Sequence, residues 1–401
     1  MMKSSGSSSS TTDFYSEAQG LFKYTRSHRR DFHAHPELAF HEFRTAGIVA
    51  QELNSLGLEV NTGFGETGVV ALLESGRPGP VVLVRADMDA LPVEEETGAT
   101  YASQTPGVMH ACGHDAHTAI LLTVARLLHH HRQELAGTVK FVFQPAEEGL
   151  GGAEKMIQQG VLENPKVDMA LALHVWNEQP VGWIGIADGP AMAGAEIFRI
   201  KVTGKGGHGA APHQVVDPLL ASAQIVTALQ SIVSRNVAPL QTAVVSVCTI
   251  HGGETFNVIP PSVEMTGTIR TFEAEVRQTV IERFENIVTQ VAGGMGCSAE
   301  IDLRQLTPAT INQPESAARL QKVARQLLPD SKVDRANYIT MGSEDFAFIL
   351  EKVPGCFVFV GSANKEKGLD GGHHSPTFDI DESILPQAAG LMATAVAELL
   401  K

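Results

Sequence analysis

The sequence predicts an α/β protein in which a domain built on a mixed or parallel β-sheet is interrupted by a smaller α+β domain. Three observations support this fold class. The chain has 401 residues, more than the ~100–200 residues of a typical domain. Short apolar runs alternate with helical segments over much of its length, as in α/β layers. A different order of elements, βαββαβ, begins near residue 193 and ends near residue 304.

The first region is predicted to start with helices and then to alternate. Apolar spacing predicts two helices that flank the turn HAHPELAFHE, the second ending at Gly57. Further helices are predicted at 119–128 and 152–160. Polar, ionisable residues follow the apolar runs from Val81 onward, and ligands of open α/β sheets lie beyond the carboxyl ends of the strands. The predicted strands are 69–73, 81–84, 139–143 and 169–173.

The inserted region has the order of a ferredoxin-like domain. Its expected elements are strand 197–202, helix 218–233, strands 243–250 and 262–270, helix 273–291 and strand 298–303. A helix at 316–328 and an apolar run at 356–360 then return to the first pattern. The expected boundaries are a disordered Ser-rich tail at 1–13, a larger domain at 14–192 and 305–401, and an inserted domain at 193–304.

Composition excludes several classes of protein. The 30 Lys and Arg against 45 Asp and Glu give a formal net charge of −15, so we expect no nucleic-acid or membrane partner. The chain has no apolar run of ~18 residues and no segment that reads as a signal peptide. Its four cysteines are scattered, which indicates a reducing compartment and predicts a cytoplasmic protein.

Metal-binding residue types gather in five short segments, four of which follow predicted strands. A single His after a strand is more often structural, but Cys, His and Glu together are good ligands for zinc, manganese, nickel or cobalt. Five such segments in one chain therefore predict a metal site. They are RADMDALP (85–92), HACGHDAH (110–117), QPAEEG (144–149), LALHVW (171–176) and GGHHSP (371–376).

Two of these segments indicate which residues bind metal and which transfer protons. Cys112 and His114 are one glycine apart, so in an extended or tight-turn backbone both side chains point to one side, and a Cys112 thiolate would bridge two ions. For His110 and His117, a supporting role and ligation both stay open. The neighbouring carboxylates of QPAEEG cannot share one direction, so we expect one to bind an ion and the other to take a proton from water.

These segments, with GKGGHGAAPH, NVIP and GTIR, resemble the co-catalytic metallopeptidase family that includes aminoacylases and glutamate carboxypeptidases. They are most similar to its amidohydrolase branch of hippurate hydrolases, N-acyl-amino-acid amidohydrolases and plant auxin-conjugate hydrolases. The resemblance runs in order from about residue 25 to the end of the chain. It implies a dinuclear metallohydrolase domain with two divalent ions and an inserted lid domain that forms a dimer interface.

The resemblance also implies a role for individual residues. Asp87 stands where peptidase relatives have a histidine ligand, which leaves its role open, and Asp89 keeps the place of the aspartate that orients the site. Glu147 would be the general base. The implied metal ligands are Cys112 as the bridge, His114 and His174 at one ion, and Glu148 and His374 at the other.

The inserted domain is expected to contribute to substrate binding. The resemblance implies that His208 reaches across the dimer and stabilises the oxyanion, although a flexible hairpin tip explains GKGGHGAAPH equally well. Asn257 and Arg270 resemble a pair that binds a substrate carboxylate, against the alternative that Arg270 is a surface cation. The segment MGSEDFAF (341–348) resembles the family's substrate-proximal loop, but its acidic residues also fit the start of a helix, and Ser343 is expected to cap that helix.

Together these features predict a metal-dependent amidohydrolase that cleaves small N-acyl-L-amino acids into a carboxylic acid and a free amino acid. The acyl group, acetyl, benzoyl or another, stays open, and a homodimer or homotetramer is expected. One alternative is a metallo-carboxypeptidase or dipeptidase acting on short peptides. The other, a non-catalytic metal- or ligand-binding protein, is less consistent with the presence of Glu147.

Overall fold

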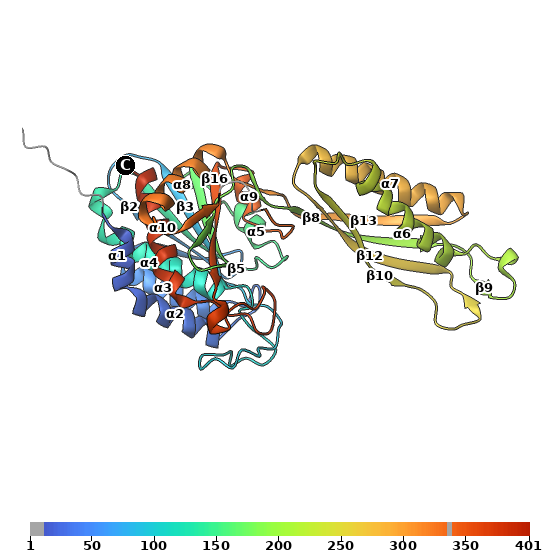
Figure 1. Cartoon of the computed structure of the whole chain (residues 1–401), viewed down its shortest axis with the longest axis horizontal. Helices are drawn as coiled ribbons and strands as arrows, with labels where there is room; N and C mark the ends of the chain where they lie inside the picture. The colour runs from blue at the N-terminus through green and yellow to red at the C-terminus, as the bar shows by residue number, and fades with distance from the viewer. Residues whose placement is uncertain (1–11, 335–338) are drawn as a thin grey trace, which may run out of the picture. The chain divides into compact units, whose positions relative to one another are not determined.

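The computed structural model describes residues 12–334 and 339–401, which form two compact units (Figure 1). The first unit contains the described residues up to Gly189, those from Asn312 to residue 334, and Lys352–Lys401. The second contains Pro190–Ile311 and Ile339–Glu351. Residues 190–192, 305–311 and 339–351, which the sequence assigned to the larger domain, therefore belong to the smaller unit.

Most of the predicted N-terminal tail lies outside the described residues, but its last residue is structured. Asp13 caps the helix α1 (Phe14–Gly20), and its carboxylate accepts the backbone N–H of Ser16 at 3.1 Å. The prediction of a disordered tail is therefore wrong at Asp13, because an Asp immediately before a helix satisfies one of its free N–H groups.

The first unit is built on an eight-stranded mixed sheet in the order β1-β2-β4-β3-β5-β16-β6-β15. At its centre β3 runs parallel to both β4 and β5, and β5 runs parallel to β16, while β1 and β2 are antiparallel at one edge. The predicted mixed sheet is confirmed. The strands are β1 (Glu59–Phe64), β2 (Gly68–Glu74), β3 (Val81–Asp87), β4 (Thr138–Gln144), β5 (Met169–Pro180), β6 (Trp183–Gly185), β15 (Lys332–Asp334) and β16 (Gly355–Ala363).

Helices pack against this sheet and bury its apolar side chains. The helix α4 starts at His114, five residues before the predicted start, because Gly113 in a left-handed conformation (φ 94°) ends the preceding loop. Besides α1, the helices of this unit are α2 (Phe22–Ala34), α3 (Phe43–Ser55), α4 (His114–His130), α5 (Gly152–Gln158), α8 (Pro314–Leu327) and α10 (Leu385–Leu399).

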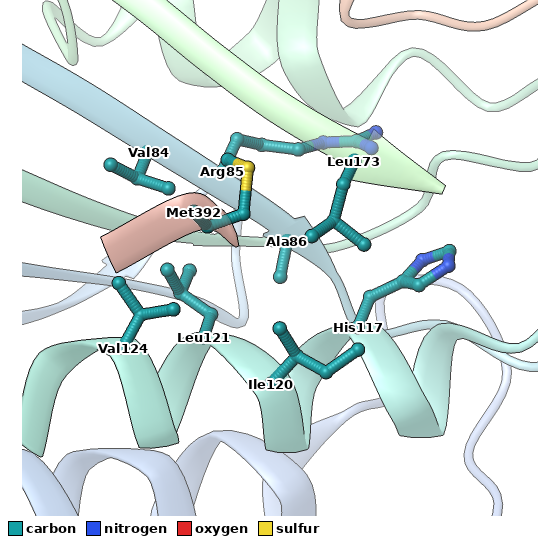
Figure 2. Close-up of a pocket in the computed structure, with 9 residues that line it drawn as sticks. All are labelled: Val84, Arg85, Ala86, His117, Ile120, Leu121, Val124, Leu173 and Met392. Atoms are coloured by element: carbon teal, nitrogen blue, oxygen red, sulfur yellow. The ribbon is translucent and has the colours of Figure 1, made fainter. Parts of the chain in front are cut away.

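The core beneath the carboxyl end of the sheet is tightly packed. Side chains of β3, β5, α4 and α10 meet around one small space beside His117 (Figure 2). This space leaves about 10 Å³ for the centre of a water molecule, which is the lower limit for one water, and its lining is mostly apolar. It is a packing defect of the core and has no room for a ligand.

The second unit has the predicted βαββαβ order, with an antiparallel sheet in the order β10-β12-β8-β13. The helices α6 and α7 lie side by side along this sheet (Figure 1). Along β8, buried Phe198 and Ile200 alternate with exposed Arg199 and Lys201, so one face packs on the helices. The main elements are β8 (Gly194–Thr203), α6 (Pro218–Arg235), β10 (Ala243–His251), β12 (Ser262–Thr271), α7 (Ala274–Gly294) and β13 (Ser298–Thr307).

Short elements complete the second unit. They are β7 (Pro190–Met192), β9 (Gly207–His208), β11 (Val258–Ile259), β14 (Thr310–Ile311) and α9 (Ala347–Leu350). Across the described part of both units, none of the helices is both long and apolar enough to pass through a membrane.

Candidate metal centre

The predicted metal-binding segments of the first unit meet where strands of its sheet end. Asp89 follows β3, and Glu147 and Glu148 follow β4. His174 lies within β5, which continues past its predicted end. Cys112 and His114 flank Gly113 at the start of α4, and His374 lies in the loop after β16. Cys112 and His114 therefore converge through a glycine turn into a helix, and not through the alternation of an extended strand.

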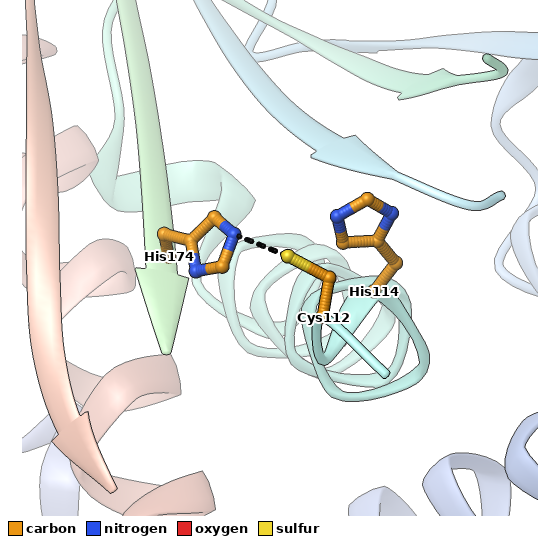
Figure 3. Close-up of side chains that lie close together, drawn as sticks. All are labelled: Cys112, His114 and His174. Carbon is orange, nitrogen blue, oxygen red and sulfur yellow. Dashed lines mark hydrogen bonds between the residues drawn. The ribbon is translucent and has the colours of Figure 1, made fainter. Parts of the chain in front are cut away.

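One group of ligand atoms comes from Cys112, His114 and His174. Their sulfur and ring nitrogen atoms all lie within 4.8 Å of one another. Figure 3 shows Nε2 of His174 pointing at Sγ of Cys112, at 3.4 Å. A sulfur and a nitrogen bound tetrahedrally to one ion would be ~3.5 Å apart, given Zn–S of ~2.3 Å and Zn–N of ~2.0 Å. The spacing therefore suits two ligands of one ion.

A second group shares the same sulfur and adds Glu148 and His374, again within 4.8 Å of one another. Oε1 of Glu148 lies 3.2 Å from Nε2 of His374 and 4.0 Å from Nε2 of His114. Because Cys112 belongs to both groups, the structure brings all five predicted ligands together around one sulfur atom.

The histidine tautomers leave the right nitrogen atoms available. Nδ1 of His114 faces two acceptors of Asp89, the backbone oxygen at 2.9 Å and Oδ1 at 3.2 Å, so it carries a proton. Nδ1 of His174 likewise donates to the backbone oxygen of Val175 at 2.6 Å. Both Nε2 atoms therefore face the site, and that of His114 is buried without a hydrogen bond from the described residues. Metal-binding histidines are usually held in this way, so the residues fit divalent ions.

Electrostatics in this site favours a cation. Burial lowers the pKa of His114, but the carboxylates of Asp87, Asp89 and Glu148 outweigh it and raise that pKa to about 10. Burial, with the charges of Glu148 and Glu147, raises the pKa of the Cys112 thiol well above its usual value. The negative charge of these carboxylates therefore favours the protonated forms of His114 and Cys112. Bound divalent ions would replace those protons.

Asp87 and Asp89 hydrogen-bond to residues in and around the two ligand groups. Asp87 accepts from Arg85 Nη1 and from His117 Nδ1, both at 2.6 Å. Nε2 of His117 accepts the backbone N–H of Val175 at 2.9 Å, so both nitrogens of His117 are engaged and neither is available to an ion. Asp89 Oδ2 accepts the backbone N–H of Glu148 at 3.1 Å, while Oδ1 holds the ring of His114. These contacts are consistent with a supporting role for Asp87 and His117.

Sequence reasoning missed a further contact of the Cys112 sulfur. Nε2 of His373 accepts the backbone N–H of Asn177 at 3.2 Å, so its proton is on Nδ1, which lies 3.8 Å from Cys112 Sγ. Burial lowers the pKa of His373 to about 3, which keeps this ring neutral. The adjacent histidines in GGHHSP were the sequence signal that could have identified His373.

His110 is buried, burial lowers its pKa to about 4, and neither ring nitrogen hydrogen-bonds to a described residue.

Glu147 is 8% exposed, and its carboxylate lies within 4.8 Å of the ligand atoms of His114 and Glu148. Ala146 before it adopts a left-handed conformation (φ 54°). That turn gives the two successive glutamates different surroundings, since Glu148 reaches His374.

The predicted substrate-binding residues lie in the second unit. Exposed His208 is next to Asn257, whose backbone oxygen accepts the N–H of Gly209 at 2.8 Å. Arg270 is half-buried near the far end of β12, roughly 26 Å along the strand from its first residue, Ser262. One copy of the chain therefore brings His208 and Asn257 together but leaves Arg270 apart from both.

Ser343 does not have its predicted capping role. Its hydroxyl accepts a hydrogen bond from Arg270 Nη1 at 2.9 Å. The short helix α9 begins at Ala347, and the carboxylate of Glu344 accepts the N–H of Phe346 at 2.9 Å. The prediction was wrong because the helix starts three residues later than a Ser343 cap requires, which places Glu344 closer to its first turn.

Comparison with known proteins agrees with this geometry. The family model of peptidase family M20/M25/M40 matches residues 83–398. N-acetylcysteine deacetylase of Bacillus subtilis is 41% identical over 383 residues, covering 93% of this chain and 96% of that protein. Thermostable carboxypeptidase 1 of Saccharolobus solfataricus is 40% identical over 365 residues, covering 90% and 91%. The solved structure of the Bacillus subtilis YXEP protein, described as a dinuclear metal-binding peptidase, has 36% identity and a TM-score of 0.83, covering 95% and 99%.

Proposed function

The chain belongs to peptidase family M20/M25/M40, and from that premise we propose that it hydrolyses the amide bond of N-acyl-L-amino acids to a carboxylic acid and a free amino acid. One observation carries the proposal: the five side chains of the two ligand groups meet around Cys112, with the carboxylate of Glu147 beside them. The similarity to an N-acetylcysteine deacetylase over most of both chains supports amide hydrolysis of this class.

We assign the residues of the metal centre two tasks. Cys112, His114, His174, Glu148 and His374 would hold two divalent ions, zinc, manganese, nickel or cobalt. When bound, such ions supply Lewis-acid activation of water and of the amide carbonyl. Glu147 removes a proton from the attacking water and delivers it to the leaving amine, while Asp89 orients His114 and Glu148 through its two oxygens.

Substrate recognition is assigned to the second unit. Arg270 is half-buried, and a sheltered guanidinium binds a planar carboxylate strongly, which an acidic protein needs for an anionic substrate. Because Asn257 and His208 lie far along the sheet from Arg270 in one copy, we propose that the partner subunit's His208 and the partner subunit's Asn257 complete the site in a homodimer or homotetramer. The imidazole would stabilise the oxyanion of the tetrahedral intermediate.

A carboxypeptidase acting on short peptides is the second candidate, favoured by the similarity to thermostable carboxypeptidase 1. It would use the same metal ligands and the same base. The two activities differ in the group on the acyl side of the scissile bond, which is a simple acid in one case and an amino acid residue in the other.

The test is a substrate panel on protein reconstituted separately with each metal. N-acetyl and N-benzoyl amino acids are compared with dipeptides, and bound metal is measured by mass spectrometry. Turnover of the N-acyl amino acids that falls at least ~100-fold in Glu147→Gln, with bound metal unchanged, supports the proposal. Exposed Glu366→Gln is the matched control. Fully metallated protein that cleaves none of the N-acyl substrates would refute it, and cleavage of dipeptides alone would establish the second candidate.

A further inference from the structure

Glu42 is a buried acid that the metal centre leaves unexplained. It ends the segment HAHPELAFHE and its side chain is 0% exposed. Its Oε1 accepts the backbone N–H of Ala146 at 3.0 Å, and its Oε2 accepts the hydroxyl of Thr67 at 2.5 Å. A carboxylate fully removed from water is costly, and burial together with the charge of Asp89 raises the pKa of Glu42. The contact with Ala146 therefore needs a reason.

Ala146 is held in a conformation that alanine avoids. Its φ of 54° lies in the left-handed region, where a Cβ is too close to the following carbonyl oxygen. Glycine is the usual residue there. Ala146 is also completely buried, so its backbone groups cannot turn to water. Such a residue persists only when its surroundings restrain it.

The restraint acts on both sides of Ala146. The Glu42 carboxylate accepts the N–H of Ala146, and the backbone oxygen of Ala146 accepts the N–H of Gly152 at 3.1 Å. A Cβ on Gly152 would lie 1.7 Å from the backbone oxygen of Pro145, so only glycine permits this close approach. Thr67 in turn fixes the second oxygen of Glu42. The turn between β4 and the two glutamates is thus clamped from the HAHPELAFHE segment and from the start of α5.

We propose that Glu42 is a positioning residue for Glu147. By holding Ala146 in the left-handed conformation, it sets the direction in which the chain leaves β4 and hence where the carboxylate of Glu147 lies. A return of Ala146 to an ordinary negative φ would rotate the following residue away from its place beside His114. This inference rests on the proposed role of Glu147 as general base, and it gives the HAHPELAFHE segment a function in the reaction.

The test compares substitutions that keep or remove the acceptor. Glu42→Gln retains an oxygen for the Ala146 N–H and is expected to keep kcat within about threefold. Glu42→Ala leaves that N–H buried without a partner, and kcat is expected to fall about 10- to 100-fold with KM within about threefold. Ala146→Gly removes the conformational penalty, so the double variant Glu42→Ala/Ala146→Gly should recover most of the lost kcat.

A carboxylate of the same segment provides the control. Glu37 accepts the backbone N–H groups of Arg44 and Thr45 at 2.9 and 2.8 Å, at the start of α3, whereas the N–H of Ala146 goes to Glu42. Glu37→Ala is expected to lower the thermal midpoint while kcat stays within about threefold. A purely structural role for Glu42 would make Glu42→Ala resemble Glu37→Ala in both measurements.

A second readout needs no activity. In metal-free protein, hydrogen exchange of a peptide covering residues 143–150 should accelerate at least about tenfold in Glu42→Ala but not in Glu42→Gln. Equal kcat losses in Glu42→Gln and Glu42→Ala, or no recovery in the double variant, would overturn the proposal, and Glu42→Gln decides the question if Glu42→Ala does not fold. Unchanged turnover in Glu147→Gln would instead refute the assigned base, while the exchange result would still report whether Glu42 restrains Ala146.

Discussion

Replacing His33 should remove a pH-dependent part of the stability. His33 is fully buried between Asp115 at 2.7 Å and Glu95 at 3.2 Å. Burial and the nearby Arg29 lower its pKa, but the two carboxylates outweigh them and raise it to about 9 from a usual 6.5. Each pKa unit corresponds to ~1.4 kcal/mol, so the charged ring stabilises the fold by roughly 3 kcal/mol.

The direction of the effect follows from the raised pKa. Below pH 6.5 the ring is protonated in both the folded and the unfolded chain, so its contribution is complete. As the pH rises towards about 9 the unfolded chain loses its proton first, and the contribution disappears.

The assay is urea unfolding of metal-free wild type and His33→Gln at several pH values. Other titrating groups are common to both proteins and cancel in the difference between their free energies of unfolding. That difference should shrink by roughly 3 kcal/mol between pH 6 and pH 9.5. A difference that stays constant, or that grows with pH, would refute the assignment of a charged His33.

Three further results are expected. Cys112→Ser should reduce bound metal from about two ions per chain to less than one by mass spectrometry, because the sulfur belongs to both ligand groups; a loss of only one ion would contradict a shared ligand. Lys140→Met should lower the free energy of unfolding by ~1–3 kcal/mol in urea while kcat is kept, because the buried amine donates to three backbone oxygens of residues 161, 163 and 165 at 2.7–3.0 Å. Removing metal with a chelator should lower the thermal midpoint of wild type by several degrees, and of Cys112→Ser by much less.

The sequence predicted the strands, and which Cys, His and Glu side chains come together, because both depend on local pattern. Buried parallel strands read as short apolar runs, and the ionisable residues after them are separated from the runs by only a few positions. The start of α4 was missed because three of the four residues in its first turn, His114, Asp115 and His117, are polar. These residues are buried by the site and not by an apolar face, so periodicity does not detect them.

Contacts between distant segments could not be predicted in this way. The helix α10 is buried on nearly every side, which removes the amphipathic pattern that identifies a surface helix. Residues 339–351 belong to the second unit although they follow α8 in the chain, and Ser343 meets Arg270 seventy-three positions away. No pattern within MGSEDFAF indicates that Ser343 contacts Arg270, so the sequence favoured the capping prediction.

Without bound cations, the charges of the site favour protonation states that differ from those that metal ligation needs. The carboxylates around His114 stabilise a proton on its ring, whereas ligation needs the neutral ring. The thiol of Cys112 is held protonated by burial and by the same carboxylates, whereas a bridging ligand must be a thiolate. Each ion that binds must therefore displace a proton from a group whose pKa the fold has raised. The carboxylates that raise these pKa values also favour divalent ions at the same place, so metal loading of the proposed centre should depend on pH as well as on metal concentration.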